Sequence, residues 1–177
     1  MIYLGNEKIN PIHLGNAKIK EAYLGNTRVY SADKAIYKDG VLANGVTLTT
    51  FENHTSGADV YTGNNVLRYG HSQTSFTQGG KTGSIAFDFT HFSSIVVKGY
   101  SKGFARQGST YCKLGIDSAS DTVTSTFSEE SFEKTFDVSQ LSGNHTIASN
   151  VFVDNTSGDT SVVAYEYIAI TEIMAYT

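Results

Sequence analysis

The sequence predicts an all-β protein in which a small repetitive sheet precedes an antiparallel β-sandwich or barrel. Three observations support this prediction. A short phrase recurs every ten residues near the amino terminus. Later segments alternate apolar and polar residues, which is typical of half-buried strands. Breaks rich in Gly, Asn, Ser and Asp separate these segments at near-even spacing, and no amphipathic helix of useful length competes with them.

The repeat occupies residues 1–31. Tyr3-Leu4-Gly5-Asn6 returns as His13-Leu14-Gly15-Asn16 and again as Tyr23-Leu24-Gly25-Asn26. Gly-Asn suits a two-residue hairpin turn because Gly accepts a positive φ and Asn tolerates one. We therefore predict a four-strand antiparallel meander, a β-meander of ten-residue repeats, that turns at the three Gly-Asn pairs.

A sheet of this size is marginal by itself, so it needs a further surface to pack against. Two interpretations stay open: a hairpin extension that packs on the same chain, and a segment that docks to another protein or to sister copies. The second interpretation assigns the contact to the apolar and aromatic residues of the repeat. These are Tyr3, Leu4, Ile9, Ile12, Leu14, Ile19, Tyr23, Leu24 and Val29.

The repeat is followed by a short polar stretch at residues 32–40, where we place a linker and a domain boundary. The second domain then spans residues 41–177. It is expected to open with a strand over 41–51 that turns at Asn44-Gly45.

Residues 52–83 are predicted to be mostly loop, with strand candidates at 58–62 and 66–69. Long loops on a rigid sandwich commonly carry binding sites. The clearest core strand follows, because Ile85, Phe87 and Phe89 alternate with polar or small residues. Further strands are predicted at 94–100, 111–117, 122–127, 132–138, 145–153 and 162–176, with a loop over 99–108.

Composition excludes several classes of function. The net charge of -4 and the pI near 5.7 argue against a nucleic-acid partner, because no basic cluster is dense enough to bind a phosphate backbone. The start lacks the basic and apolar regions of a signal peptide, and no apolar run is long enough for membrane insertion. We expect a protein made in the cytoplasm that works outside the cell after lysis or particle release.

No catalytic motif stands out, so we do not expect an enzyme. Gly79-Gly80-Lys81-Thr82-Gly83 lacks the spacing and the following helix of a phosphate-binding loop. Cys112 is the only cysteine, and its alternating neighbours predict a buried small hydrophobe.

No metal site or cofactor is predicted beyond an unproven structural calcium, for which the oxygen-rich candidates are Asp117, Asp121, Glu129, Glu130, Asp154, Asn155 and Asp159. Turn chemistry explains these residues equally well.

A sugar site needs an aromatic platform beside polar groups. Two stretches offer this combination. The first contains Tyr61, Arg68, Tyr69 and His71, and the second contains Phe104, Arg106 and Tyr111. The alternative is that these residues are loop anchors or interface residues.

Two resemblances narrow these predictions. The stretch from Phe136 to Gly143, followed by strands that close with Tyr167 to Ile170, resembles jelly-roll domains of the galactose-binding-like and carbohydrate-binding-module type. The repeated Tyr-Leu-Gly-Asn-x-Lys-Ile phrase of residues 1–30 resembles short β-repeats in structural proteins of tailed bacteriophages and prophages. The second resemblance implies a homo-oligomeric virion component of the tail, baseplate, fibre or capsid-decoration type, whose repeats dock to other virion proteins.

The sequence therefore predicts a non-enzymatic virion structural protein that presents a β-sandwich for host-surface glycan adhesion or for decoration of the shell or tail. Many weak sites on one particle would give strong adhesion by avidity. The alternative is a free carbohydrate-binding module of a bacterial surface or secreted protein.

Overall fold

The computed structural model describes the chain in several stretches. Backbone is described for strands within residues 2–31 and for 33–54, 66–74, 76–124, 126–159 and 163–177. Side chains are described for 33–51 and for the same later stretches. Every regular element in these residues is a β-strand, so the all-β prediction is confirmed. Within the described residues there is no helix long and apolar enough to cross a membrane.

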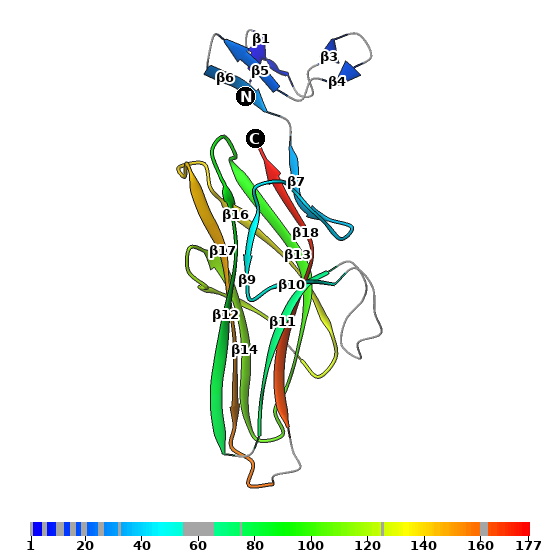
Figure 1. Cartoon of the computed structure of the whole chain (residues 1–177), viewed down its shortest axis with the longest axis vertical. Helices are drawn as coiled ribbons and strands as arrows, with labels where there is room; N and C mark the ends of the chain where they lie inside the picture. Colours follow the sequence, from blue (N-terminus) through cyan, green and yellow to red (C-terminus); the bar gives the residue numbers. More distant parts are fainter. Residues whose placement is uncertain are drawn as a thin grey trace.

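The repeat forms strands on both sides of each Gly-Asn pair, as predicted. The strands are β1 (Ile2–Leu4), β2 (Glu7–Ile9), β3 (His13–Leu14), β4 (Ala17–Lys18), β5 (Glu21–Leu24) and β6 (Thr27–Ser31). They pair as three antiparallel hairpins, β1 with β2, β3 with β4 and β5 with β6 (Figure 1). This pairing corrects the single four-strand meander. Pro11, between β2 and β3, has no N–H to donate to a continuous ladder. The side chains of the nine predicted docking residues lie outside the described residues.

Two larger antiparallel sheets form the sandwich. The seven-stranded sheet contains β7 (Lys34–Lys38), β8 (Val41–Leu42), β10 (Glu52–His54), β11 (Val66–Gln73), β13 (Ser94–Phe104), β16 (Glu130–Asp137) and β18 (Ala164–Tyr176). Its order is β10-β11-β18-β13-β16, with β7 paired to β18 and β8 paired to β7. The five-stranded sheet contains β9 (Thr47–Thr49), β12 (Thr77–Asp88), β14 (Gly108–Ile116), β15 (Asp121–Val123) and β17 (Asn144–Asn155), in the order β15-β14-β17-β12-β9.

Successive long strands change sheet. The chain passes from β11 to β12, back to β13, on to β14, and later from β16 to β17 to β18, so that each step crosses the sandwich. This crossing gives the antiparallel jelly-roll architecture that the sequence predicted. Figure 1 shows the long strands running along the two layers from one end of the sandwich to the other.

The hydrophobic core lies between the sheets and is densest toward the end that carries the C-terminus. Ile95, Leu114 and Ile147 are completely buried there. The predicted alternation of the strand that contains Ile85 and Phe87 is confirmed, because both side chains face this core. Burial of this kind stabilises by about 1.5–3 kcal/mol per large apolar side chain.

Three predicted boundaries are wrong. Residues 34–38 of the expected linker form β7, which pairs with β18, because Ile36 and Tyr37 are apolar and completely buried between charged neighbours. The sandwich therefore begins at β7.

Most of the described part of the expected loop at 52–83 is strand, namely β10, β11 and the first half of β12. The expected loop at 99–108 is also mostly strand, since β13 continues to Phe104. The strand candidate at 58–62 lies outside the described residues.

Candidate functional site

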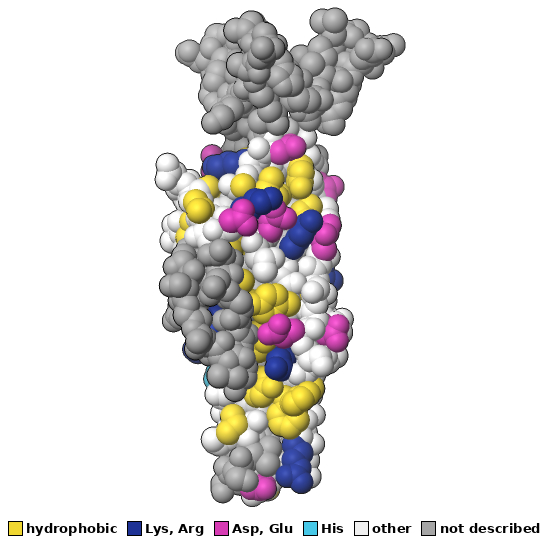
Figure 2. Space-filling model, turned by 90° about the vertical axis from the view of Figure 1, so that its right-hand side faces the viewer, with side chains coloured by type: hydrophobic (Ala, Val, Ile, Leu, Met, Phe, Trp, Pro, Cys, Tyr) yellow, Lys and Arg dark blue, Asp and Glu magenta, His cyan; other side chains and the backbone are white. Residues whose placement is uncertain are grey.

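The outer face of the seven-stranded sheet carries rows of side chains across β13, β18 and β11. Two rows adjoin a cavity. In one, Lys102 is paired with Tyr167, which is paired with Gly70. In the next, Phe104 is paired with Tyr165, which is paired with Ser72. Figure 2, which views the side of the molecule on which β7 and β18 lie in Figure 1, shows hydrophobic side chains interspersed with charged ones.

We call Tyr100, Phe104, Tyr165 and Tyr167 the aromatic face, since their alternation on β13 and β18 directs all four away from the core. The Phe104 ring lies 5.9 Å from the Tyr165 ring and 5.4 Å from the Phe127 ring, centroid to centroid. Phe127 is 67% exposed. Aromatic surface is therefore continuous across neighbouring strands and open to solvent.

Tyr167 is the fixed member of the aromatic face. Its hydroxyl donates a hydrogen bond to Oε1 of Glu129 at 2.6 Å, and only 8% of the residue is exposed. Burial, followed by the hydrogen bond and the charge of Glu129, raises the pKa of Tyr167 well above its ordinary value. The hydroxyl therefore stays protonated at physiological pH, and the ring is held in one orientation.

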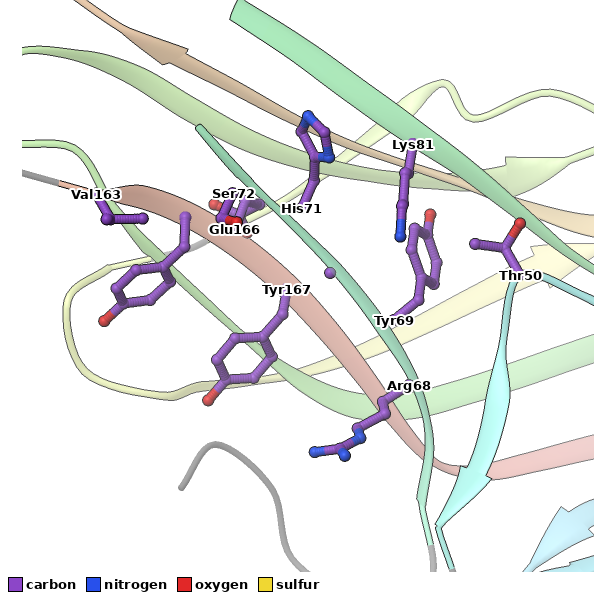
Figure 3. A pocket seen from close by; sticks show the side chains of 11 residues that line it. Thr50, Arg68, Tyr69, His71, Ser72, Lys81, Val163, Glu166 and Tyr167 are labelled. Carbon is purple, nitrogen blue, oxygen red and sulfur yellow. The ribbon is translucent and has the colours of Figure 1, made fainter. Parts of the chain in front are cut away.

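A cavity of about 450 Å³ opens beside the aromatic face. It wraps around β11. Beyond Arg68, one edge of β11 pairs with β18, and the other edge has no described partner strand. Figure 3 shows Arg68 and Tyr167 on one side of this strand and His71 and Lys81 on the other. The lining residues are Thr50, Arg68, Tyr69, Gly70, His71, Ser72, Lys81, Val163, Tyr165, Glu166 and Tyr167.

Gly70 makes this arrangement possible. A Cβ at this position would lie 2.9 Å from the Tyr167 Cβ and 3.1 Å from the Glu166 carbonyl oxygen. Both distances are too short for ordinary contact, so any other residue would push β18 away. The same reasoning applies at Gly79 on β12, where a Cβ would lie 2.9 Å from Nε2 of His71 and even closer to the Gln73 amide. Glycines thus make room for the polar side chains of the cavity.

Polar groups converge on the side of the cavity that faces β12. The side-chain nitrogen of Gln73 lies 2.8 Å from Nε2 of His71. Burial and the nearby Lys81 ammonium lower the pKa of His71, so the imidazole is neutral at pH 7 and offers both a donor and an acceptor. Thr50, at the edge of the cavity, has φ of 69°, which is strained for a β-branched residue.

The interior behind the cavity is also polar. Glu166 is completely buried between the sheets and faces inward on β18. The Tyr69 hydroxyl donates a 2.8 Å hydrogen bond to Oγ of Ser149 on the opposite sheet. Cys112 is completely buried nearby, and burial raises the pKa of its thiol far above the ordinary value. The prediction that Cys112 packs as a small hydrophobe is confirmed.

The structure separates the predicted ligand residues into groups. Arg68, Tyr69 and His71 line the cavity, and Phe104 lies on the adjoining aromatic face. Tyr111 lies on the opposite sheet, stacked on Phe152 at 5.0 Å between centroids.

The remaining two predicted residues are not placed at the cavity. Arg106 lies in the loop after β13, where its guanidinium is 3.8 Å from the Asp159 carboxylate. Tyr61 lies outside the described residues.

Sequence reasoning missed Lys81, Tyr165, Glu166 and Tyr167, all of which line the cavity. A signal for two of them was present, because Tyr165 and Tyr167 are two positions apart and therefore lie on the same face of a strand. The sequence around Lys81 gave no such signal, because its glycine neighbours suggested only a turn.

Two of the oxygen-rich residues considered for calcium are held by protein partners. Asp117 is hydrogen-bonded to His145 and to the backbone N–H of Thr146, and Asp159 pairs with Arg106. In the part of the chain that the structure describes, no three His, Cys, Asp or Glu side chains gather as a metal site would require.

Comparisons with known proteins give structural likenesses alone. No protein-family model and no curated protein matches the chain. A xylan-binding domain of family CBM22 from Paenibacillus barcinonensis Xyn10C is similar, with 14% identity and a TM-score of 0.41, over 84% of this chain and 99% of that one. The glycoside hydrolase domain of Endo-D from Streptococcus pneumoniae R6 is similar with 13% identity and a TM-score of 0.33, over 84% of this chain and 20% of that one. Both likenesses are too weak to indicate a ligand for this chain.

Proposed function

We propose that the chain is a non-enzymatic saccharide-binding protein whose site is the aromatic face together with the adjoining cavity. The observation that carries the proposal is their junction: a cavity of about 450 Å³ has the Tyr165 and Tyr167 rings on one side and several hydrogen-bonding side chains on the other. Sugars present apolar C–H faces to aromatic rings and hydroxyls to polar groups, so they match both halves.

Each half has a distinct role in the proposal. Tyr165, which is more exposed than Tyr167, supplies a platform for a sugar ring, with Ser72 paired to it on β11. Arg68 lies further along β11, beyond the partner of Tyr167, where it also lines the cavity. His71 and Lys81 donate to hydroxyl or acidic oxygen atoms of the next sugar unit. The buried Glu166 carboxylate makes the floor of the cavity polar.

The repeats would supply attachment. We propose that β1 to β6 dock the chain to sister copies and to other proteins of a phage-like particle, which would place it in the virion. Two observations support this proposal. The repeated sequence resembles phage β-repeats, and each described hairpin is a separate two-stranded sheet whose outer edges could pair with another strand. A free carbohydrate-binding module is the second candidate, and the same sandwich site supports it equally.

Binding is tested with the full chain on a broad glycan array and then by calorimetry with any saccharide that binds. Tyr165→Ala is expected to weaken affinity at least about tenfold, roughly 1.4 kcal/mol, because the stacking platform is lost. Tyr165→Phe keeps the platform and should retain affinity. Phe76→Ala is the matched control, since Phe76 is a 76% exposed aromatic in a loop that does not line the cavity. Silence across the array would favour pure decoration and remove the saccharide proposal.

Attachment is tested by light scattering of the full chain and of a chain lacking residues 1–31. The described sandwich ladders do not involve β1 to β6, so the shorter chain keeps its fold. A smaller assembly is expected without the repeats. An unchanged size would show that the repeats do not drive oligomerisation. Failure of the full chain to bind isolated phage-like particles would favour the free carbohydrate-binding module.

A further inference from the structure

The outer face of the five-stranded sheet has its own rows of side chains, on the side of the sandwich opposite to the aromatic face. Tyr111, Phe152 and Gly80 are paired in register across β14, β17 and β12. Two residues further along these strands, a second row consists of Lys113, Asn150 and Thr82. A third row follows, with Gly115, Ala148, Ser84 and Thr49. Aromatic, amide and hydroxyl groups therefore succeed one another along a single surface.

A hollow of about 390 Å³ lies over the parts of the second and third rows that belong to β17, β12 and β9. Its side chains are small, and most of them carry a hydroxyl or amide. They are Thr49, Thr82, Ser84, Asp117, Ser118, Ala119, Thr146, Ala148, Ser149 and Asn150, with Gly83. The one carboxylate, that of Asp117, already accepts hydrogen bonds from His145 and from Thr146. The hollow is thus polar without a strong charge of its own.

Asn150 gives the hollow a specific binding group. Its Oδ1 atom is shielded from solvent and has no hydrogen-bond partner among the described residues, although the residue as a whole is partly exposed. A shielded acceptor without a donor costs roughly 1–3 kcal/mol, so turning this amide to meet a donor in the hollow relieves a cost that an open surface does not carry. A sugar hydroxyl is a donor of the right size.

The first row supplies a platform next to the hollow. The Tyr111 and Phe152 rings are stacked with an interplanar angle of 12°, and the Lys113 ammonium lies 5.2 Å from the Tyr111 ring centroid. Phe152 also covers Gly80, where an added Cβ would lie 3.3 Å from the Phe152 ring. The glycine lets the aromatic ring lie low on the sheet, so the surface from platform to hollow stays shallow.

We propose that this surface is a second, separate saccharide site that binds a neutral oligosaccharide, with one sugar unit against the Tyr111–Phe152 pair and the next donating a hydroxyl hydrogen bond to Asn150 Oδ1. A neutral ligand fits the hollow, because its lining is dominated by hydroxyl, amide and small side chains and does not include Lys113. A protein partner fits less well, because none of the residues lining the hollow is a large apolar side chain that would anchor an interface.

Two sites on opposite faces make a single chain bivalent. A polysaccharide held at one face raises the effective concentration at the other face of neighbouring chains, so avidity arises without any oligomer. The second site does not depend on the cavity beside β11, and either site can fail while the other stands.

The test uses the full chain with a panel of soluble neutral polysaccharides: a mannan, a xylan, a β-glucan and a starch. Tyr165→Ala weakens the first site, and the residual binding of this variant is measured by calorimetry. Adding Asn150→Leu, which removes the acceptor at similar volume, is expected to weaken the residual affinity at least about tenfold, and adding Tyr111→Ala should do the same. Asn144→Ala is the matched control, because Asn144 is exposed on the same strand outside the hollow.

Nuclear magnetic resonance of the unmutated chain checks the same site without any variant. Titration of the polysaccharide that binds should shift the Asn150 side-chain amide signals and the backbone signals of β17 in a saturable way. Complete loss of binding in Tyr165→Ala, with no shifts at Asn150, would overturn the second site and leave the first intact. If no member of the panel binds the unmutated chain by either method, the second site is rejected, and the glycan array alone then decides the proposed function.

Discussion

The two ends of the sandwich interior are built from different chemistry. Toward the C-terminus the space between the sheets is filled by apolar side chains that are completely buried, among them Phe89, Ile95 and Ile147. Toward the other end, the same two layers enclose Glu166, which is also completely buried, and the pair formed by His71 and Gln73. The cavity beside the aromatic face opens at this polar end.

The difference separates stability from recognition. Apolar packing stabilises in proportion to the area removed from water, and it leaves no groups for a ligand. Polar side chains in the interior need partners and space, and glycines on β12 and β13 provide the space. We therefore expect changes at the apolar end to affect folding alone, and changes at the polar end to affect both folding and binding.

The strongest test of the comparison is Ile147→Ala at the apolar end. The side chain is completely buried, so its truncation leaves a cavity and should cost about 3 kcal/mol of unfolding free energy. Saccharide affinity at the aromatic face should not change. Chemical denaturation measures the first quantity and calorimetry the second. A loss below about 1 kcal/mol would mean that the apolar end is not the main source of stability.

At the polar end, Gly103→Ala should cost about 2 kcal/mol through overpacking, because the new Cβ would overlap Oε2 of Glu166 and Oγ1 of Thr110. Displacing Glu166 should also weaken binding at the cavity. The control is a double-mutant cycle with Glu166→Ala, in which the cost of Gly103→Ala should fall markedly. Equal costs in both backgrounds would show that Glu166 does not occupy the space beside Gly103.

A smaller effect is expected between the two ends. Tyr69→Phe removes the buried hydrogen bond to Ser149 and should cost about 1 kcal/mol. Ser149→Ala in the same cycle reports the coupling of the two hydroxyls. Denaturant titration of the four chains gives the energies, and additive losses would contradict the observed hydrogen bond.

The smallest effect is a pH dependence at the exposed Asp117–His145 ion pair, in which Nδ1 and Oδ2 are 2.7 Å apart. The hydrogen bond that His145 donates to Asp117 raises the pKa of His145 above its ordinary 6.5, and the same bond lowers the pKa of Asp117 below its ordinary 3.8. The raised histidine pKa stabilises fully below 6.5, and this contribution is lost as pH rises through the folded-state value. The lowered aspartate pKa stabilises above 3.8, and this contribution is lost as pH falls through its folded-state value.

The pair should therefore contribute most between about pH 4 and 6.5. The melting temperature of His145→Gln is the measurement. Its deficit against the unmutated chain should be larger at pH 5 than at pH 8, and His91→Gln, an exposed histidine in another turn, is the control. Equal deficits at both pH values would show that the charge on His145 does not matter.

Much of the fold was predictable from local pattern. The Gly-Asn pairs of the repeat lie between paired strands, the alternation of Ile85, Phe87 and Phe89 marks a core strand, and the burial of Cys112 followed from its neighbours. The two stretches wrongly predicted as loops share a cause. Glycines on β12 and β13 suggested loops, whereas in the sheet they sit where a neighbouring side chain or strand occupies the space of a Cβ.

The sequence by itself determined the all-β class, the turns of the repeat and the residues of the apolar core, because these depend on local periodicity and turn chemistry. Tertiary structure alone decided the site. Pairing of β11 with β18 brings Arg68 and His71 beside Tyr165 and Tyr167, about a hundred positions away, and the crossing between sheets sends Tyr111 to the opposite face. Strand order arises from pairing between distant segments, and single-strand patterns carry no information about it.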